Sequence, residues 1–234
     1  MQRSYTLGEL AKFLHRSEKE IERLASSGTL RGRKLKGDWI FSLPDVVLWM
    51  ESEMIQVDSQ QTVILEDAVG SSSDDENYSI SLSNILDIDS IELSFSAKTK
   101  VSVINEIVKL GERVGKLWDP VEMARELKER EEMNSTAIDS GVAILHPRRP
   151  QPNIISEDFL ALAVSRTPIP FGGGFNNNTD VFFLLCCQTD TSYLRTLGKL
   201  ARVLKSQGFL DNLRECDAPV SVLELLEKTE NELE

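Results

Sequence analysis

Residues 135–148 read STAIDSGVAILHPR, and within them the apolar run Val142–Leu145 ends at His146. An uninterrupted apolar run of this kind is typical of a buried strand. The chain has only two histidines, and this one is followed closely by Arg148. A neutral imidazole at the end of a rigid strand, with guanidinium groups nearby, is suited to accept a phosphoryl group, because the nitrogen attacks while positive charge meets the phosphoryl oxygens. Spacing alone leaves open a histidine without a catalytic role, at the surface or at the edge of the core.

A longer motif extends upstream from this histidine. Residues 130–146 read REEMNSTAIDSGVAILH, with an Arg-Glu pair, two hydroxyl residues, a glycine and then the apolar run. The motif resembles that of the enzyme IIA domain of bacterial sugar phosphotransferase systems, of the mannitol/fructose and nitrogen-regulatory type. The resemblance covers residues 81–234 and continues through FFLLCC at 182–187 and LRTLGKL at 194–200. It implies an α/β domain with a mixed sheet flanked by helices, in which His146 is phosphorylated and Arg130 flanks the phosphate.

Two positions depart from the family pattern. Leu145 stands where the family places a proline before the histidine, which changes local stiffness rather than chemistry. Tyr193 stands where the family carries a second histidine, and a tyrosine donates a hydrogen bond while staying neutral near pH 7. The residues expected at the phosphoryl site, with hydroxyl donors and a second arginine included, are His146, Arg130, Ser135, Thr136, Arg148 and Tyr193.

The first 30 residues have the spacing of two short helices. Thr6 with Glu9, and Ser17 with Glu20, each fit a capping box, and apolar residues follow each pair at helical intervals. The second helix is expected to end at Gly28. Because the connection between the two helices is short, the segment predicts a helix-turn-helix.

A basic hairpin is predicted next. Residues 30–41 read LRGRKLKGDWIF, which indicates two short strands with Lys36-Gly37-Asp38 at the tip. Trp39 and Phe41 are expected to anchor the hairpin to the core, and a third helix is expected to begin at residues 43–45. The whole pattern resembles the excisionase/MerR-like winged helix-turn-helix over about the first 53 residues.

This second resemblance implies a DNA-binding domain. Its second helix would enter the major groove and its hairpin, the wing, would contact an adjacent groove or the backbone. Helix side chains would read bases, whereas wing cations would hold phosphates. The residues expected to face DNA are Ser17, Lys19, Glu20, Arg23, Arg31, Arg33, Lys34 and Lys36. Acidic residues in the second helix partly cancel its charge, so a solvated hairpin on a protein-binding module stays open as the alternative.

The net charge of −12 is unevenly distributed along the chain. Residues 1–55 carry 9 basic and 8 acidic residues, residues 56–80 carry 6 acidic and no basic residues, and residues 81–234 carry 17 basic and 24 acidic residues. Only the N-terminal segment can approach nucleic acid without strong repulsion. The polar, acidic segment 56–80 is too poor in apolar residues to fold and is expected to be a flexible linker.

Composition excludes several other classes of protein. Cys186 and Cys187 lie inside an apolar run, which favours buried small side chains over a disulfide framework. Two distant histidines and the lack of a Cys-x-x-Cys pair predict no metal site, and no cofactor is expected. The glycines of residues 171–178 lack the Gly-Lys-Ser/Thr of a P-loop and predict a turn between strands. No stretch has the composition of a signal peptide or the length of a bilayer span, so a cytoplasmic protein without membrane contact is expected.

The periodicity of residues 81–234 alternates between strand and helix. Strands are expected at 141–145, 160–165 and 181–187, and helices near 101–108, 120–127, 194–204 and 220–226. The predicted domains are therefore a small, α-rich winged helix-turn-helix at 1–55, a linker at 56–80, and an enzyme IIA-like α/β domain at 81–234.

These features together predict a cytoplasmic transcription regulator that carries a phosphohistidine rather than acting as a free-standing enzyme. The resemblance implies an HPr-like phosphocarrier, or its nitrogen-branch relative, as donor, with DNA as the second partner. A regulated protein target and an oligomeric state stay open. Two alternatives also stay open: a phosphotransfer intermediate whose N-terminal domain does not bind DNA, and a degenerate module that senses a partner without accepting phosphate.

Overall fold

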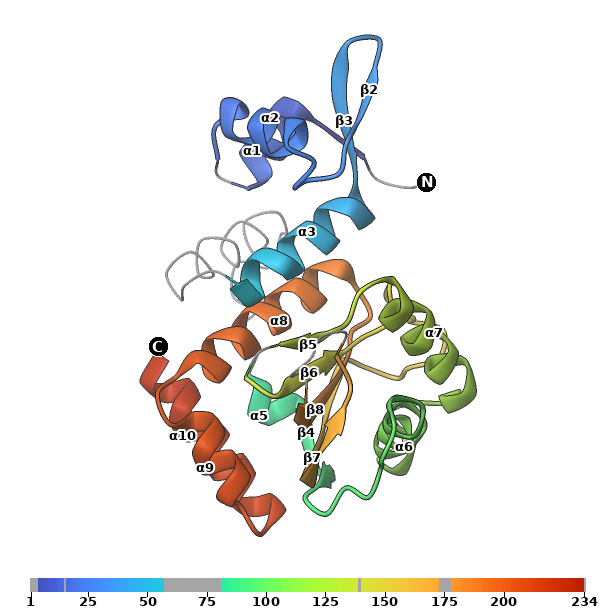
Figure 1. Cartoon of the computed structure of the whole chain (residues 1–234), viewed down its shortest axis with the longest axis vertical. Helices are drawn as coiled ribbons and strands as arrows, with labels where there is room; N and C mark the ends of the chain where they lie inside the picture. The colour runs from blue at the N-terminus through green and yellow to red at the C-terminus, as the bar shows by residue number, and fades with distance from the viewer. Residues whose placement is uncertain (1–3, 15, 57–80, 139, 173–177, 234) are drawn as a thin grey trace. The chain divides into compact units, whose positions relative to one another are not determined.

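The computed structural model describes residues 4–14, 16–56, 81–138, 140–172 and 178–233, and of residues 51–56 it describes only the backbone. These residues form two compact units, which are described separately (Figure 1). Apart from Gln56, the segment expected to be a flexible linker lies outside the described residues, as does most of the glycine-rich turn expected at 171–178.

The N-terminal unit is a small helical domain with a three-stranded antiparallel sheet. Its elements are β1 (Ser4–Thr6), α1 (Leu7–Phe13), α2 (Glu18–Ser26), β2 (Arg33–Leu35), β3 (Asp38–Ser42) and α3 (Leu43–Gln56). The strands lie in the order β1-β3-β2, so that β2 and β3 form the wing. The predicted helices and hairpin are confirmed. Strand β1 was not predicted, because three residues are too few to show an alternating pattern.

Capping explains where the first two helices begin. The Glu9 carboxylate accepts a hydrogen bond from the Thr6 backbone N–H at 2.8 Å, while Thr6 Oγ1 accepts from the Glu9 N–H, so the first capping box is complete. The second predicted box is only half formed. Ser17 Oγ accepts from the Glu20 N–H at 3.3 Å, but the Glu20 carboxylate accepts from the Arg16 guanidinium at 2.7 Å.

The tip of the wing is a two-residue turn. Lys36 and Gly37 have φ values of 53° and 102°, and they join the cross-strand pair of Leu35 and Asp38. Positive φ at both central residues is the geometry of the type I′ turn, whose twist matches that of the flanking strands. The sequence had predicted Asp38 at the tip of the hairpin. In the structure Asp38 is instead the first residue of β3.

The C-terminal unit is built on a mixed five-stranded sheet. Its strands are β4 (Leu86–Glu92), β5 (Ala137–Ile138), β6 (Val142–Leu145), β7 (Phe159–Pro170) and β8 (Asn178–Cys186). They lie in the order β4-β7-β8-β6-β5. The pairs β4–β7 and β6–β8 are parallel, whereas β7–β8 and β5–β6 are antiparallel. This arrangement confirms the predicted α/β class with a mixed sheet.

Helices flank this sheet on both sides. The helices of this part of the chain are α5 (Leu82–Ile85), α6 (Lys100–Arg113), α7 (Pro120–Met133), α8 (Asp190–Lys205), α9 (Phe209–Glu215) and α10 (Pro219–Leu233). Of α8, residues Leu194–Arg202 are grouped with the first unit. Helices α6 and α7 cover one face, and α9 and α10 lie on the other side (Figure 1). Buried Ile107 and Leu127 from α6 and α7 pack in one core with Phe159 and Phe182 of the central strands. None of the helices in the described parts of the chain combines the length and apolar character needed to span a bilayer.

Four elements of this unit were not predicted. Helices α5 and α9 have 4 and 7 residues, and β5 has only two, so each is too short for a clear periodic signal. Strand β4 reads LDIDSIE, in which Asp87 and Asp89 interrupt the apolar pattern. It becomes a strand because it pairs along β7, and that contact is visible only in the tertiary structure.

Candidate functional site

His146 directly follows β6 and has a fixed ring orientation. Strand β6 is buried throughout between β5 and β8, which holds the preceding backbone in place. The Nδ1 atom of His146 lies 2.9 Å from the carbonyl oxygen of Ile144. Since a carbonyl oxygen only accepts hydrogen bonds, Nδ1 is the protonated nitrogen and Nε2 of the neutral ring carries the lone pair.

Arg130 reaches this lone pair from the last turn of α7. Its Nε–H donates to His146 Nε2 at 3.0 Å, and its Nη1 donates to the backbone carbonyl of Asn134 at 2.9 Å. The second bond occupies a carbonyl oxygen just past the end of the helix. Arg130 and His146 are 6% and 3% exposed, so the guanidinium and the imidazole face each other largely away from solvent. The two residues expected to act together at the site are therefore in direct contact.

Glu131 organises the segment that joins α7 to the sheet. Its carboxylate accepts hydrogen bonds from Ser135 Oγ at 2.6 Å and from the backbone N–H and Oγ1 of Thr136 at 2.9 and 2.7 Å. It also pairs with Lys100 Nζ at 3.0 Å. The two hydroxyls expected to serve as donors at the phosphoryl site thus donate to Glu131 in this structure. This role of Glu131 was not predicted, although hydroxyl residues four and five positions after a glutamate at a helix end are a signal that the sequence contains.

The other two candidates lie at different distances from the imidazole. The Tyr193 ring, near the start of α8, lies 5.1 Å from the His146 ring between centroids, with an angle of 39° between the planes. The centroid distance lies within the roughly 4.5–7 Å at which aromatic rings contact each other. Arg148 is exposed and lies two residues beyond His146. The structure therefore brings Arg130 and Tyr193 to the imidazole and leaves Arg148 on the surface nearby.

The N-terminal unit places the predicted DNA-facing side chains on two elements. On α2, Lys19 and Arg23 are both exposed and stand four residues apart, on the face opposite the buried Ile21 and Ala25. Ser17 serves as the helix cap, and Glu20 is paired with Arg16. Arg16 in turn lies over the Trp49 ring, at 5.5 Å from its centroid. The pairing of Glu20 with Arg16 was not predicted, and it leaves Lys19 and Arg23 as the cations of the α2 surface.

The wing presents its cations along an exposed hairpin. The four basic residues expected there are exposed: Arg31, Arg33, Lys34 and Lys36. Lys34 Nζ lies 5.0 Å from the Trp39 ring centroid, a cation–π distance. Trp39 stacks on Phe41 at 6.0 Å, and Phe41 is fully buried, so the two rings connect the hairpin to the core as expected.

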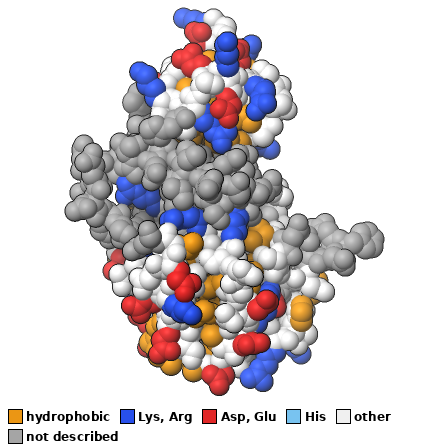
Figure 2. All heavy atoms as spheres, turned by 90° about the vertical axis from the view of Figure 1, so that its left-hand side faces the viewer, with side chains coloured by type: hydrophobic (Ala, Val, Ile, Leu, Met, Phe, Trp, Pro, Cys, Tyr) orange, Lys and Arg blue, Asp and Glu red, His pale blue; other side chains and the backbone are white. Residues whose placement is uncertain are grey.

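Charge on this unit is mixed rather than uniform. In Figure 2, basic and acidic side chains are intermixed on the visible face of the N-terminal unit, whose strands and first helices are drawn in blue in Figure 1. Exposed Glu18 and Glu22 of α2 contribute acidic charge beside Lys19 and Arg23. Nucleic-acid binding by this unit would therefore depend on the wing for most of its positive charge. His15 lies outside the described residues, and the described residues contain no group of three potential metal-ligating side chains.

Comparisons with known proteins match both units. The family model described as "Phosphoenolpyruvate-dependent sugar phosphotransferase system, EIIA 2" matches residues 84–229. A model described as "Helix-turn-helix domain" matches residues 4–54. Together the two matches support a regulatory, DNA-binding protein related to the phosphotransferase system. A search of curated proteins gave no match.

Solved structures resemble the C-terminal unit in fold. The nitrogen regulatory protein IIA-Ntr of Neisseria meningitidis is 23% identical, with a TM-score of 0.55 over 62% of this chain and 97% of that chain. The IIA mannitol protein of Escherichia coli is 17% identical, with a TM-score of 0.54 over 60% of this chain and 97% of that one. A putative IIA domain of Streptococcus pyogenes is 18% identical, with a TM-score of 0.56 over 65% and 98%.

Proposed function

This chain belongs to the EIIA 2 family of the phosphoenolpyruvate-dependent sugar phosphotransferase system, and we propose that it accepts a phosphoryl group on Nε2 of His146 and binds DNA through its N-terminal unit. The observation that carries the proposal is the pair of hydrogen bonds on His146. The Ile144 carbonyl holds the proton on Nδ1, and Arg130 approaches Nε2 at 3.0 Å. A nucleophile with a defined lone pair and a guanidinium beside it is what phosphoryl transfer requires of a protein, since positioning and charge supply most of the catalysis.

The transfer step moves one phosphoryl group between two imidazoles. The Nε2 lone pair of His146 forms the new N–P bond while the P–N bond of a phosphohistidine on an HPr-like carrier breaks, and the carrier imidazole leaves with that electron pair. Each ring keeps the proton on its other nitrogen, so no proton transfer is needed. Arg130 exchanges its hydrogen bond to Nε2 for hydrogen bonds to the phosphoryl oxygens, where a charge-assisted contact is stronger. The Ile144 carbonyl stabilises the N–H of the phosphorylated ring.

Phosphotransfer from a purified HPr-like carrier tests this assignment. Wild type is expected to acquire an acid-labile label, His146→Ala to acquire none, and His15→Ala to be labelled normally. Arg130→Ala should slow labelling by about 100-fold or more, the scale on which loss of one stabilising donor slows acyl transfer. Arg148 is exposed near the site, and Arg148→Ala should slow labelling far less than Arg130→Ala does. Labelling of His146→Ala, or equal effects of the two arginine variants, would contradict the proposal.

The salt dependence of DNA binding tests the second half. Replacing Arg33 and Lys34 by alanine removes two exposed wing cations and should reduce the salt slope by about two units, since each lost phosphate contact removes roughly 0.9. Replacing Lys109 and Arg125 by alanine removes the same charge from the C-terminal unit and should leave the slope unchanged. An unchanged slope in the wing variant would favour a phosphotransfer intermediate whose N-terminal unit binds protein, a function that the acidic side chains of α2 also suit.

A degenerate module that senses a partner without accepting phosphate is the other candidate. The observation that favours it is Tyr193, which packs against His146 and cannot carry the positive charge of a histidine near pH 7. Under that function the carrier would not label wild type, whereas Tyr193→His, which restores a histidine at this position, should regain labelling. Under the proposed function both are labelled, and DNA affinity measured with and without the phosphoryl group then shows whether the two units are coupled.

A further inference from the structure

A cavity of about 560 Å³ opens in the C-terminal unit where β4 and β7 approach their carboxyl ends, at the opposite end of the sheet from His146. It is lined by the segment that follows β4, residues 94–98, and by the later part of β7, residues 165–169. His146 follows the carboxyl end of β6, which is parallel to β8 and therefore antiparallel to β7. Because β4 is parallel to β7, the carboxyl ends of β4 and β7 lie at the opposite end of the sheet from the carboxyl end of β6 and His146. The cavity is therefore separate from the candidate phosphoryl site.

Its position is one at which α/β proteins commonly bind ligands. In open α/β sheets, ligands bind in the crevice outside the carboxyl ends of parallel strands. Here the ends of adjacent parallel strands β4 and β7 face the cavity, and α6 begins directly after the β4 segment. Its volume also falls within the roughly 300–1,000 Å³ of small-molecule sites.

A bulge in β7 shapes one wall of the cavity. The register with β8 shifts between the pair Val164–Val181 and the pair Ile169–Thr179, so residues 165–168 leave the regular ladder. Ser165, which is buried, fixes the bulge: its Oγ donates to the Thr167 carbonyl at 2.7 Å and accepts from the Thr167 N–H at 3.4 Å. Bulges of this kind are over-represented beside functional sites, where they redirect side chains.

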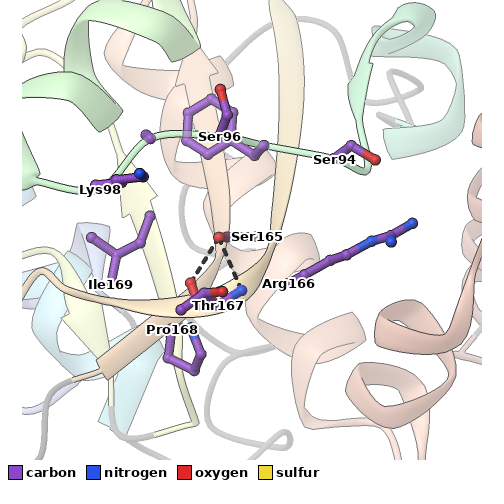
Figure 3. A pocket seen from close by; sticks show the side chains of 10 residues that line it. Ser94, Ser96, Lys98, Ser165, Arg166, Thr167, Pro168 and Ile169 are labelled. Atoms are coloured by element: carbon purple, nitrogen blue, oxygen red, sulfur yellow. Dashed lines mark hydrogen bonds between the residues drawn. The ribbon is translucent and has the colours of Figure 1, made fainter.

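Two cations stand at the cavity without acidic partners. Figure 3 shows Lys98 and Arg166 on opposite sides of Ser165. Neither side chain forms an ion pair or hydrogen bond with another residue in the part of the chain that the structure describes. The acidic residue at the end of β4, Glu92, is paired with Arg113. Both side chains are exposed, in a region, residues 81–234, that has a net charge of −7.

The remaining lining residues divide into hydroxyls and an apolar floor. Ser94, Ser96 and Thr167 supply hydroxyl groups, whereas Phe95 and Ile169 belong to the hydrophobic core and are 7% and 2% exposed. Hydroxyls and cations suit the oxygens of an anion, and the buried apolar residues suit a hydrocarbon portion. We infer that this cavity binds a small organic anion, a carboxylate or phosphate monoester on an apolar carbon body. Such a ligand would give the chain an input independent of phosphorylation at His146.

Titration of the ¹⁵N-labelled full chain with phenyl phosphate and with phenylacetate tests the inference. Both probes join an anionic group to an apolar ring, and comparison of the two separates phosphate from carboxylate. Saturable chemical-shift changes are expected at the amides of residues 94–98 and 165–169 with at least one probe. The variant Lys98→Gln/Arg166→Gln should weaken that binding at least tenfold. The matched variant Lys109→Gln/Arg125→Gln removes the same charge from exposed positions of α6 and α7 and should bind within twofold of wild type.

Three results would overturn the inference. The first is the lack of saturable changes at these amides with both probes. The second is equal weakening by the two double variants, which would indicate a general effect of net charge. The third is binding of phenol or of inorganic phosphate as tight as that of the better probe, since neither combines the anion with the apolar body. Because the cavity is separate from His146, Lys98→Gln/Arg166→Gln should keep a normal phosphotransfer rate. Loss of ligand binding and failure of phosphotransfer can therefore be distinguished.

Discussion

Substitution of Glu131 by glutamine should destabilise the C-terminal unit and slow phosphotransfer, although residue 131 touches neither His146 nor the phosphoryl group. The change is nearly isosteric, so it alters charge and hydrogen bonding without leaving a cavity. Glu131 is 5% exposed and receives three hydrogen bonds and one ion pair. The Glu131→Gln substitution therefore tests whether this carboxylate fixes the segment that joins Arg130 to the sheet.

The expected cost follows from these contacts one by one. If the glutamine oxygen faces Thr136, both Thr136 bonds persist without the carboxylate charge, and hydrogen bonds to charged groups are stronger than neutral ones by about 1 kcal/mol. The amide NH₂ then faces Ser135 Oγ, which can accept, and the Lys100 ammonium, which cannot. The Lys100 side chain is 38% exposed, so solvent screening limits the loss of that pair, to about 0.5–1 kcal/mol. The total is about 2–4 kcal/mol.

Urea unfolding followed by far-ultraviolet circular dichroism measures this loss. With a slope of about 2 kcal/mol per molar urea, the midpoint of Glu131→Gln should fall by about 1–2 M. Glu132→Gln is the matched control, because Glu132 is the next residue and is exposed, and it should stay within about 0.5 kcal/mol of wild type. Equal midpoints for the two variants would refute the reasoning. Normal phosphotransfer in a destabilised Glu131→Gln would separate stability from the positioning of Arg130.

Three further outcomes are expected. A Cβ on Gly111 would lie 2.7 Å from the buried Phe159 ring, so Gly111→Ala should lower the free energy of unfolding by about 1–2 kcal/mol despite the gain of roughly 1 kcal/mol in helix propensity; a more stable variant in urea would contradict this. Gly37 has φ +102° with open space around it, so Gly37→Ala should destabilise the N-terminal unit through backbone strain alone, by about 1–2 kcal/mol. Tryptophan fluorescence on heating, in a Trp118→Phe background that leaves Trp39 and Trp49 as reporters, would detect this loss, and an unchanged midpoint would contradict it. Burial raises the pKa of the Cys186 thiol strongly and that of the partly exposed Cys216 less. A thiol reagent should therefore modify only Cys216 in the native chain, faster as the pH rises and the thiolate forms, and reaction of Cys186 before unfolding would show that the strand opens.

Local signals in the sequence account for much of the fold. Thr6 begins its helix where expected, and the helix expected near residues 120–127 begins after Asp119, whose side chain accepts a hydrogen bond from the Glu122 N–H at 2.9 Å. The apolar runs predict β6, β7 and β8, because a buried strand between neighbours needs no polar face. Such signals depend on residues within a few positions of one another, and for that reason they can be read without tertiary contacts.

The contacts of the candidate sites are of another kind. Arg130 and His146 are 16 residues apart, and their hydrogen bond exists because α7 packs on the sheet with its last turn beside the end of β6. The motif pointed to both residues through a family resemblance, but the direction of the lone pair depends on the Ile144 carbonyl, and the role of Ser135 and Thr136 depends on Glu131. The spacing of Glu131, Ser135 and Thr136 is compatible with these bonds, but the hydroxyls could equally have faced His146, and the folded segment decides between the two.

The sequence by itself predicted two segments of different charge, most of their longer helices and the buried strands β6, β7 and β8, and it indicated His146 and, through a family resemblance, Arg130 as candidates for phosphoryl chemistry. Only the tertiary structure decided that β4 is a strand, that Lys100 is paired with Glu131, and that a bulge in β7 opens a cavity beside Lys98 and Arg166. The physical reason is range. Helix caps and apolar periodicity act over a few residues, whereas strand pairing, ion pairs across elements and cavities arise from segments that meet only when the chain has folded.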